Sequence, residues 1–236
     1  MNKTEVRQAL RYEAQQYIPF KMEDVIFDYH IISSSAGASG DKMKILLVAA
    51  RKQSVMESVD FIRQAGLAPK LIDVNSFCLI NCFQKNGPKI KEDDVVALVN
   101  LEFDLVNIDI LQGEIPFFTR DISLTEDDLS LQREMDKEKG FFERMKPALA
   151  NLIREIRLSI DYFESEFEKQ VSVIYFSGAG ANDNELISFF NSQLGRDIKL
   201  WNPVQNMVID STRINLQALK EVSPTLALAC GLALRG

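Results

Sequence analysis

The sequence VSVIYFSGAGA at residues 171–181 is the stretch that decides the fold. Its first half is almost continuously apolar, which is typical of a strand buried on both faces. Its second half is a glycine-bearing loop, and the residues at about 183–194 then have the apolar spacing of a helix that Gly195 caps. A buried strand that leads through such a loop into a helix indicates an α/β protein.

The loop itself admits two interpretations. Ser177, Gly178 and Gly180 leave little side chain at the end of the strand, so a ligand could reach the backbone, and the N-terminus of the next helix favours an anion. The loop is not a GxGxxG fingerprint, and it lacks the lysine of a P-loop. The other interpretation, which the loop alone favours, is an ordinary tight turn between a strand and a helix.

The residues around this strand continue the pattern. Strands are predicted at 94–100, 105–112 and 115–123, with a tight turn at Gly113, and a long helix is predicted at about 146–169 with Pro147 in its first turn. The apolar stripe of this helix consists of Leu149, Ile153, Ile156, Ile160, Phe163 and Phe167. The middle strand alternates between two faces, with Val106, Ile108 and Ile110 on one and Asn107, Asp109 and Leu111 on the other.

Two more helices are predicted in the second half of the chain. One starts at Ser123 or Thr125, where two capping patterns overlap, and is interrupted at Gly140. The other is the last element and runs from Ser223 to Leu234.

The first 94 residues are predicted to form a small α+β unit with a return strand and a linker. The first predicted element is a helix that starts at Asn2 and is ended by Pro19, with its apolar face between Val6 and Tyr17. Strands at 25–32 and 44–50 around a polar turn at 33–41 follow, and then a helix at 52–64 with Val55, Val59 and Ile62 facing inward. The unit continues with a strand at 70–74, a helix at 76–84 and a polar loop at 84–94. The whole chain is therefore predicted to be α/β, of the mixed α+β kind.

Composition excludes several classes of function. The chain has 236 residues, a net charge of −7 and a pI of about 4.9, so a nucleic-acid partner is not expected. A single histidine, His30, excludes every multi-histidine metal site. Three cysteines cannot all pair, which suggests a reducing compartment. No apolar run is long enough to span a membrane, and the N-terminus lacks the apolar core of a signal peptide, so the expected location is the cytoplasm without direct membrane insertion.

No catalytic constellation or metal site is predicted. Glu102 and Asp104 at a hairpin could hold magnesium, but a solvated acidic turn is the favoured interpretation. Cys78 and Cys82 share one helix face without a second pair of ligands, which favours core thiols over a metal site.

The order of several segments resembles the PilM family, cytoplasmic actin-like proteins of the type IV pilus assembly platform that are related to FtsA. The segments are RYEAQQYIPF, VIFDYHII, LLVAAR, GLAPKLIDV, ALVNL, FFTRDIS, REIRLSIDYFES, IYFSGAGA and CGLALRG, which together extend over nearly the whole chain. The resemblance implies a partial actin-like ATPase fold with an inserted small α+β subdomain. It assigns residues 1–68 to that insert, 69–92 to the return strand, helix and linker of the first lobe, and 93–236 to the second lobe.

The same resemblance implies a non-catalytic scaffold that captures the short cytoplasmic tail of an inner-membrane partner, PilN, and is thereby peripheral to the inner membrane. The alternatives are a nucleotide-binding ATPase or kinase of the actin-like superfamily and the cytoplasmic domain of a GspL-like type II secretion protein. An oligomer is compatible with each of them.

Nucleotide binding is where the chain departs from the family pattern. Asn100, Ser177, Gly178 and Gly180 fall where the family binds its nucleotide, but the family's N-terminal Asp-x-Gly hairpin has no counterpart in this sequence. Glu102 also stands where the second phosphate loop has glycine, which adds bulk and negative charge. We therefore expect no bound cofactor and weak or absent ATP binding, with Mg-ATP expected only if the missing hairpin is present.

The partner is expected to dock near Tyr17, Ile18, Pro19 and Phe20. Pro19 ends the first helix and leaves Phe20 on an extended segment, so a solvent-reachable aromatic–proline corner results. The alternative is a helix end packed in the core, which would account for the same aromatic residues.

Overall fold

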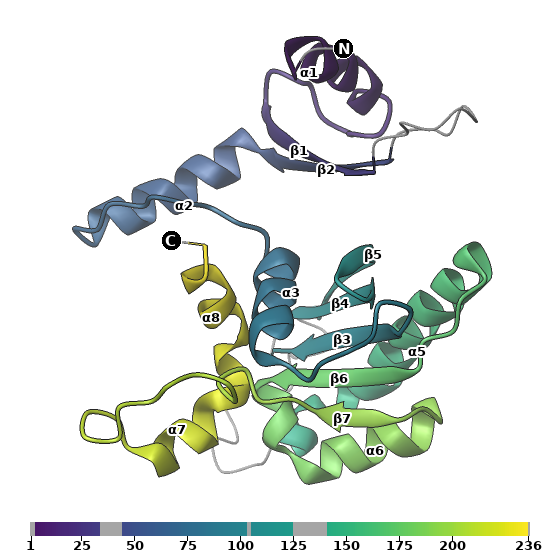
Figure 1. Ribbon diagram of the computed structural model, residues 1–236, viewed down its shortest axis with the longest axis vertical. Coiled ribbons are helices and arrows are strands. Elements are labelled where there is room, and N and C mark those ends of the chain that lie inside the picture. Colours follow the sequence, from purple (N-terminus) through teal and green to yellow (C-terminus); the bar gives the residue numbers. More distant parts are fainter. Residues whose placement is uncertain (1–2, 34–43, 103–104, 125–140, 236) are drawn as a thin grey trace. The chain divides into compact units, whose positions relative to one another are not determined.

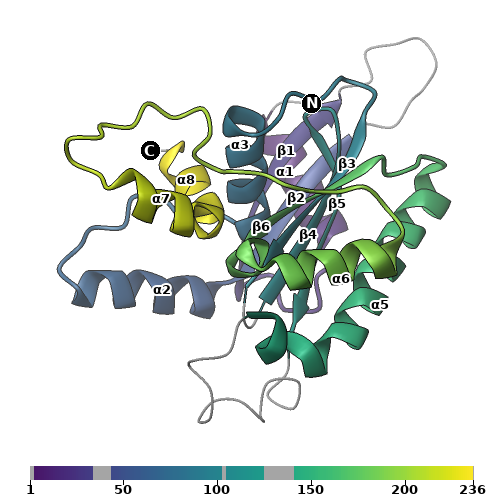
Figure 2. The same cartoon turned by 90° about the horizontal axis from the view of Figure 1, so that it is seen from below.

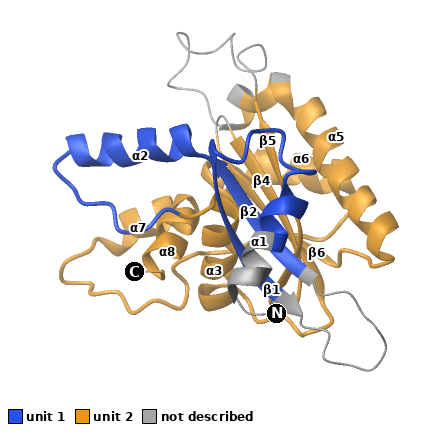
Figure 3. Cartoon of the chain, turned by 90° about the horizontal axis from the view of Figure 1, so that it is seen from above, with its two compact units in different colours: residues 1–72 blue, residues 73–236 orange. Residues whose placement is uncertain are grey.

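The computed structural model describes residues 3–33, 44–102, 105–124 and 141–235. The chain forms two compact units, residues 1–72 and 73–236, which are coloured separately in Figure 3. The division expected from the sequence, into 1–68, 69–92 and 93–236, stays a prediction. The turn expected at 33–41 and the helix expected between Ser123 and Gly140 lie, apart from their first residues, outside the described part of the chain.

The first unit contains a two-stranded sheet between two helices. Its elements are α1 (Lys3–Ala14), β1 (Val25–Ser33), β2 (Lys44–Arg51) and α2 (Lys52–Gln64). The two strands are antiparallel, with Tyr29 opposite Leu47, and they correspond to the strands predicted at 25–32 and 44–50. Helix α1 ends at Ala14, before the proline that was expected to stop it, and in the turn that follows the carbonyl of Ala14 accepts the amides of Tyr17 and Ile18.

Helix α2 and the residues after it differ from the expectation. No residue of α2 is buried: Val55 and Val59 are half-buried, and Ile62 is 36% exposed. The strand expected at 70–74 is not formed, and Leu71 and Ile72 are partly exposed. A β-like run becomes a strand only when another strand offers it hydrogen bonds, and the described residues offer none here.

The second unit is built on a five-stranded sheet. Its strands are β3 (Val95–Leu101), β4 (Leu105–Gln112), β5 (Ile115–Ser123), β6 (Val173–Gly178) and β7 (Ile198–Leu200), in the spatial order β5-β4-β3-β6-β7. The first three form an antiparallel meander, and β6 and β7 add to it in parallel. This mixture of parallel and antiparallel strands confirms the α/β class.

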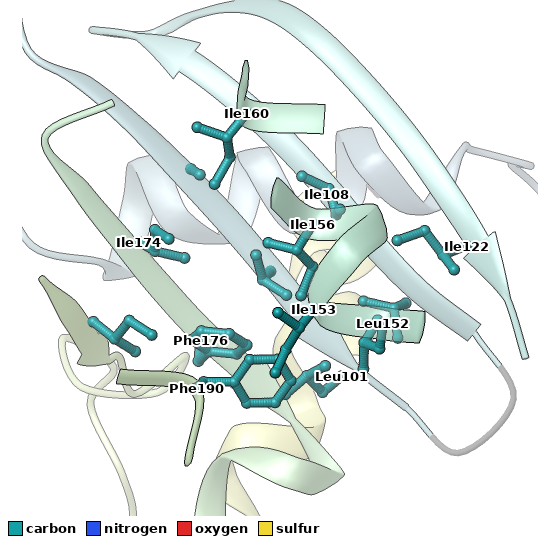
Figure 4. Close-up of a cluster of buried hydrophobic side chains, with 14 of the residues drawn as sticks. Leu101, Ile108, Ile122, Leu152, Ile153, Ile156, Ile160, Ile174, Phe176 and Phe190 are labelled. Carbon is teal, nitrogen blue, oxygen red and sulfur yellow. The ribbon is translucent and has the colours of Figure 1, made fainter. Parts of the chain in front are cut away.

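One face of the sheet packs against α5 (Phe141–Phe167) and α6 (Asn184–Leu194) (Figures 1 and 2). The predicted stripe of α5 is confirmed, with Ile156 and Ile160 buried in the cluster that Figure 4 shows. The helix begins earlier than expected, so Pro147 lies in its second turn. Asp183 binds the N-terminal ends of both α5 and α6. One of its carboxylate oxygens accepts hydrogen bonds from the backbone amides of Glu185 and Leu186 in α6, and the other accepts from the Phe142 amide of α5 at 2.7 Å.

The opposite face is covered by α3 (Asn75–Asn86) and α8 (Ala227–Ala233). The core of this face includes Leu79 and Phe83 of α3, and the Phe83 ring meets the Trp201 ring edge-on at 5.2 Å. Cys78 and Cys82 are buried there, as expected for core thiols, and burial raises the pKa of Cys82 to about 12.

The last predicted helix is divided into two short elements, a 3₁₀ turn and α8. The chain passes from β6 through η1 (Ala179–Asn182) into α6, and after β7 it forms α7 (Leu216–Val222), η2 (Ser223–Leu226) and then α8. Within the described part of the chain, no helix has the length and apolar character needed to cross a bilayer.

Candidate functional site

The residues predicted to contact a nucleotide lie together at the ends of β3 and β6. Asn100 lies opposite Ser177 in the parallel pair, and the Ser177 hydroxyl donates to Asn100 Oδ1 at 2.9 Å. The Asn100 amide donates in turn to Glu102 Oε1 at 3.4 Å. Both Asn100 and Ser177 are buried, and Gly180 is buried beside them in η1. The side chains of Asn100 and Ser177 therefore have their hydrogen-bond partners within this group of residues.

Gly178 has a packing reason to be glycine. Its φ of +90° with a ψ of −176° is a backbone region that is essentially restricted to glycine. A Cβ at this position would lie 2.4 Å from the Leu101 carbonyl oxygen and 2.7 Å from the Leu101 nitrogen. Strand β3 thus approaches the glycine loop so closely that no side chain fits, with or without a ligand.

The pair Asn100–Ser177 extends into a row of polar residues across four strands. Asn107 of β4 lies opposite Asn100, and Asp121 of β5 lies opposite Asn107. The Asn107 amide donates to Asp121 Oδ1 at 2.6 Å. Asn107 is fully buried, whereas Asp121 lies exposed at the edge of the sheet.

A buried carboxyl group lies next to this row. Asp109, two residues beyond Asn107 on the same face of β4, is fully buried. Its Oδ1 accepts a hydrogen bond from Thr119 at 2.5 Å, and the Thr119 hydroxyl is 2.6 Å from the hydroxyl of Ser76 in α3. Burial, opposed by these hydroxyl donors and reinforced by the charge of Asp121, raises the pKa of Asp109 to about 6.

Sequence reasoning found the first pair and missed the rest of the row. The alternation of Asn107 and Asp109 with apolar residues predicts one polar face, which in an antiparallel strand usually meets solvent. Here α3 lies over that face, so the polar side chains are buried instead. The detectable signal was a second polar pair, Thr119 and Asp121, at the same spacing on the next strand.

A cavity in the first unit lies at the residues expected to bind a partner. It has a volume of about 450 Å³ and is lined by Phe20, Lys21, Asp24, Arg51, Lys52, Gln53 and Met56. The Arg51 guanidinium lies over the Phe20 ring, 5.4 Å from its centroid, and the Lys52 amide donates to the Asp24 carbonyl at 2.8 Å. The cavity therefore combines apolar surface from Phe20 and Met56 with three cationic side chains and one carboxylate.

The neighbouring predicted residues are on the surface of this unit. Tyr17 is 79% exposed and Phe20 is 47% exposed, Pro19 is exposed, and Ile18 is half-buried. The interpretation of this corner as a helix end packed in the core does not agree with these exposures. Of the four residues, Phe20 is the one that lines the cavity.

The described residues contain no group of three or more His, Cys, Asp or Glu side chains placed to hold a metal ion. Asp104, which could have acted with Glu102 at the β3–β4 hairpin, lies outside the described residues. The Glu102 amide closes that hairpin by donating to the Leu105 carbonyl at 3.0 Å.

Comparison with known proteins gives the same assignment over the whole chain. A family model described as type IV pilus assembly protein PilM matches residues 1–132 and 137–236. The solved structure of a PilM–PilN type IV pilus biogenesis complex is similar with a TM-score of 0.85 and 25% identity, over 100% of this chain and 73% of that chain. This likeness shows that the chain has the fold of the matched chain over its full length.

Two further structures are similar at a lower level. A protein of unknown function with an actin-like ATPase fold from Bacteroides thetaiotaomicron matches with a TM-score of 0.44 and 11% identity, over 84% of this chain and 62% of its own. The ethanolamine utilization protein EutJ from Carboxydothermus hydrogenoformans matches with a TM-score of 0.43 and 13% identity, over 82% of this chain and 81% of the EutJ chain. From the family match and the PilM likeness together, this chain belongs to the PilM family of type IV pilus assembly proteins.

Proposed function

We propose that this chain is a scaffold of the type IV pilus assembly platform and binds a short cytoplasmic tail of a PilN-like partner at the cavity beside Phe20. Its family membership and its similarity to PilM in a PilM–PilN complex support this proposal. In this proposal the chain is held at the cytoplasmic face of the inner membrane through that partner.

The observation that carries the proposal is the cavity itself. Its volume of about 450 Å³ is within the range of small ligand sites, and it accommodates a few side chains of a peptide. Phe20 and Met56 offer apolar surface for an anchoring side chain, and buried aromatic contacts supply much of the affinity of small interfaces. Tyr17 and Pro19 precede Phe20 within three residues of the chain and are exposed, so they add accessible apolar surface to this segment.

We expect Phe20→Ala to weaken tail binding about tenfold or more, because truncating an anchor at an interface costs about 1–2 kcal/mol or more. Fluorescence anisotropy with a labelled peptide from the tail of the PilN-like partner measures the affinity. The melting temperature should change little, because Phe20 is half-exposed in the free protein.

Phe61→Ala is the matched control for this experiment. Phe61 is an exposed phenylalanine, 74% accessible, on the helix that also carries Met56, and it does not line the cavity. If the two variants and the parent chain bind the tail peptide with equal affinity, the tail does not bind at the cavity beside Phe20. A collapse of the Phe20→Ala melting curve would instead identify Phe20 as a packing residue.

ATP binding stays the second candidate, and no described contact favours it over the scaffold. Asn100 and Ser177 bond to each other, and Glu102 brings a carboxylate to the hairpin where a phosphate would approach. We expect calorimetric titration with Mg-ATP to show no saturable binding up to millimolar concentrations. Micromolar affinity would show that the Glu102 carboxylate is tolerated and would restore the nucleotide-binding hypothesis.

A further inference from the structure

The Asp109 carboxyl group is buried in an environment that does not neutralise its charge. Oδ1 accepts from Thr119, but Oδ2 has no hydrogen-bond partner among the described residues. The side chains that act on it are the hydroxyls of Thr119 and Ser76 and the carboxylate of Asp121. A buried carboxylate without a cationic partner is costly, so a protein must protonate it or provide a positive charge.

The nearest basic residue along β5 is not available to Asp109. Arg120 lies between Thr119 and Asp121 and therefore points to the other face of the sheet. There its guanidinium binds Glu155 Oε2 at 2.6 Å and Ser159 Oγ at 3.3 Å, both on α5. The groups that act most strongly on Asp109 thus include no basic side chain of the described residues, so its charge is relieved either by protonation or by a cation that binds there.

A second buried oxygen close by also lacks a partner in the described part of the chain. The Asn107 side chain is fully buried and donates through Nδ2 to Asp121, which leaves its Oδ1 without a hydrogen bond. Asn107 and Asp109 are two residues apart on one strand and so face the same side, and Asp121 is directly opposite Asn107. One neutral and two anionic side chains thus offer oxygen atoms to the same small region.

We propose that a hard divalent cation, Mg²⁺ or Ca²⁺, binds at Asn107, Asp109 and Asp121. Carboxylate and amide oxygens are the ligands such ions prefer, and both ions keep water molecules in the remaining positions. The ion takes the free Oδ2 of Asp109 and the free Oδ1 of Asn107, and it screens Asp109 from Asp121. Asp121 is exposed at the sheet edge and provides the route of entry.

Thermal unfolding of the full chain with and without the ions tests this proposal. At pH 7.5, after removal of metals with EDTA, we expect MgCl₂ or CaCl₂ to raise the melting temperature by about 5–10 °C at a hundredfold excess over the dissociation constant. KCl at equal ionic strength should leave the melting temperature unchanged. The comparison of the two ions identifies the preferred one, and paramagnetic resonance of added Mn²⁺ should report one bound ion per chain.

Asp109→Asn and Asp121→Asn should each abolish most of the ion-dependent shift and the bound Mn²⁺. The shift is compared within each variant, because removing a buried charge changes the melting temperature by itself. Asp161→Asn, at an exposed position of α5, is the control that should keep the full shift. An unchanged melting temperature of the parent chain in both ions, or a shift that survives in Asp121→Asn, overturns the proposal.

Discussion

Replacing Gly231 with alanine is expected to destabilise residues 73–236 by about 4 kcal/mol or more, which corresponds to a fall in melting temperature of about 10 °C. An added Cβ would lie 1.7 Å from the Cys78 carbonyl oxygen and 2.4 Å from its carbon. Both are backbone atoms of α3, so no change of rotamer relieves the clash. Helix α8 must move away from α3, and the core that includes Phe83 and Ala227 opens with it.

Gly195→Ala is the matched control for that variant. Gly195 has a φ of +61° at the end of α6, and no atom of the described residues comes within 4 Å of a Cβ added there. It should therefore cost only about 1–2 kcal/mol for the left-handed backbone. Both substitutions reduce the freedom of the unfolded chain, and only Gly195→Ala adds the cost of a left-handed backbone, so a larger loss at Gly231 must come from the contact between α8 and α3. Equal losses measured by urea denaturation would mean that α3 and α8 do not pack as closely as described.

The second large effect is expected at Gly178. Alanine there meets both a glycine-only backbone conformation and the Leu101 backbone at 2.4–2.7 Å, so we expect a loss of about 3–5 kcal/mol. The pairing of β6 with β3 must distort, and this pair lies at the centre of the sheet. The fluorescence of Trp201, the single tryptophan, reports the loss, because its buried ring packs against Phe83 and its amide bonds to the Phe176 carbonyl.

The result at Gly178 also separates two explanations of the glycine loop. If the glycine is needed for strand approach, the alanine variant loses stability in the absence of any ligand. If the melting curve of Gly178→Ala instead matches that of the parent chain, the close contact with Leu101 is not maintained in solution. In that case the loop regains its interpretation as a place where a ligand reaches the backbone.

The sequence was most informative where one pattern was enough to define an element. The predicted stripe of α5 packs against the core, where Met145, Ala148 and Leu152 of the same helix join it, because burial at helical spacing is a local property of the chain. The β4–β5 hairpin was equally clear, since Gly113 has the positive φ that such turns need.

Elements that depend on a neighbour could not be predicted in the same way. The run at 70–74 has strand composition, but a strand also requires a pairing edge. Asn107 and Asp109 have the pattern of solvent-facing residues, yet α3 covers them, and no local pattern specifies which helix covers which face. Glycine at 178 suggested space for a ligand, whereas the Leu101 backbone fills that space.

The same limit applies to the two candidate sites. Phe20 could be proposed because a proline and aromatic residues are adjacent in the chain. The cavity also requires Arg51 and Met56, which come from β2 and α2 and meet Phe20 only in the folded unit. The polar row likewise joins residues as distant in sequence as Asn100 and Ser177.

The contact between α3 and α8 has a consequence for biosynthesis. Among the described elements of the second unit, these two helices are the first and the last, and the central strands β3 and β6 are separated in the chain by the whole of β4, β5 and α5. On the ribosome, α3 emerges early and can pack on β3 and β4, but the part of it that meets α8 has no partner until α8 is translated. Since closing long loops slows folding, this unit should complete its core only after α8 has left the ribosome, and until then its nascent chain exposes apolar surface.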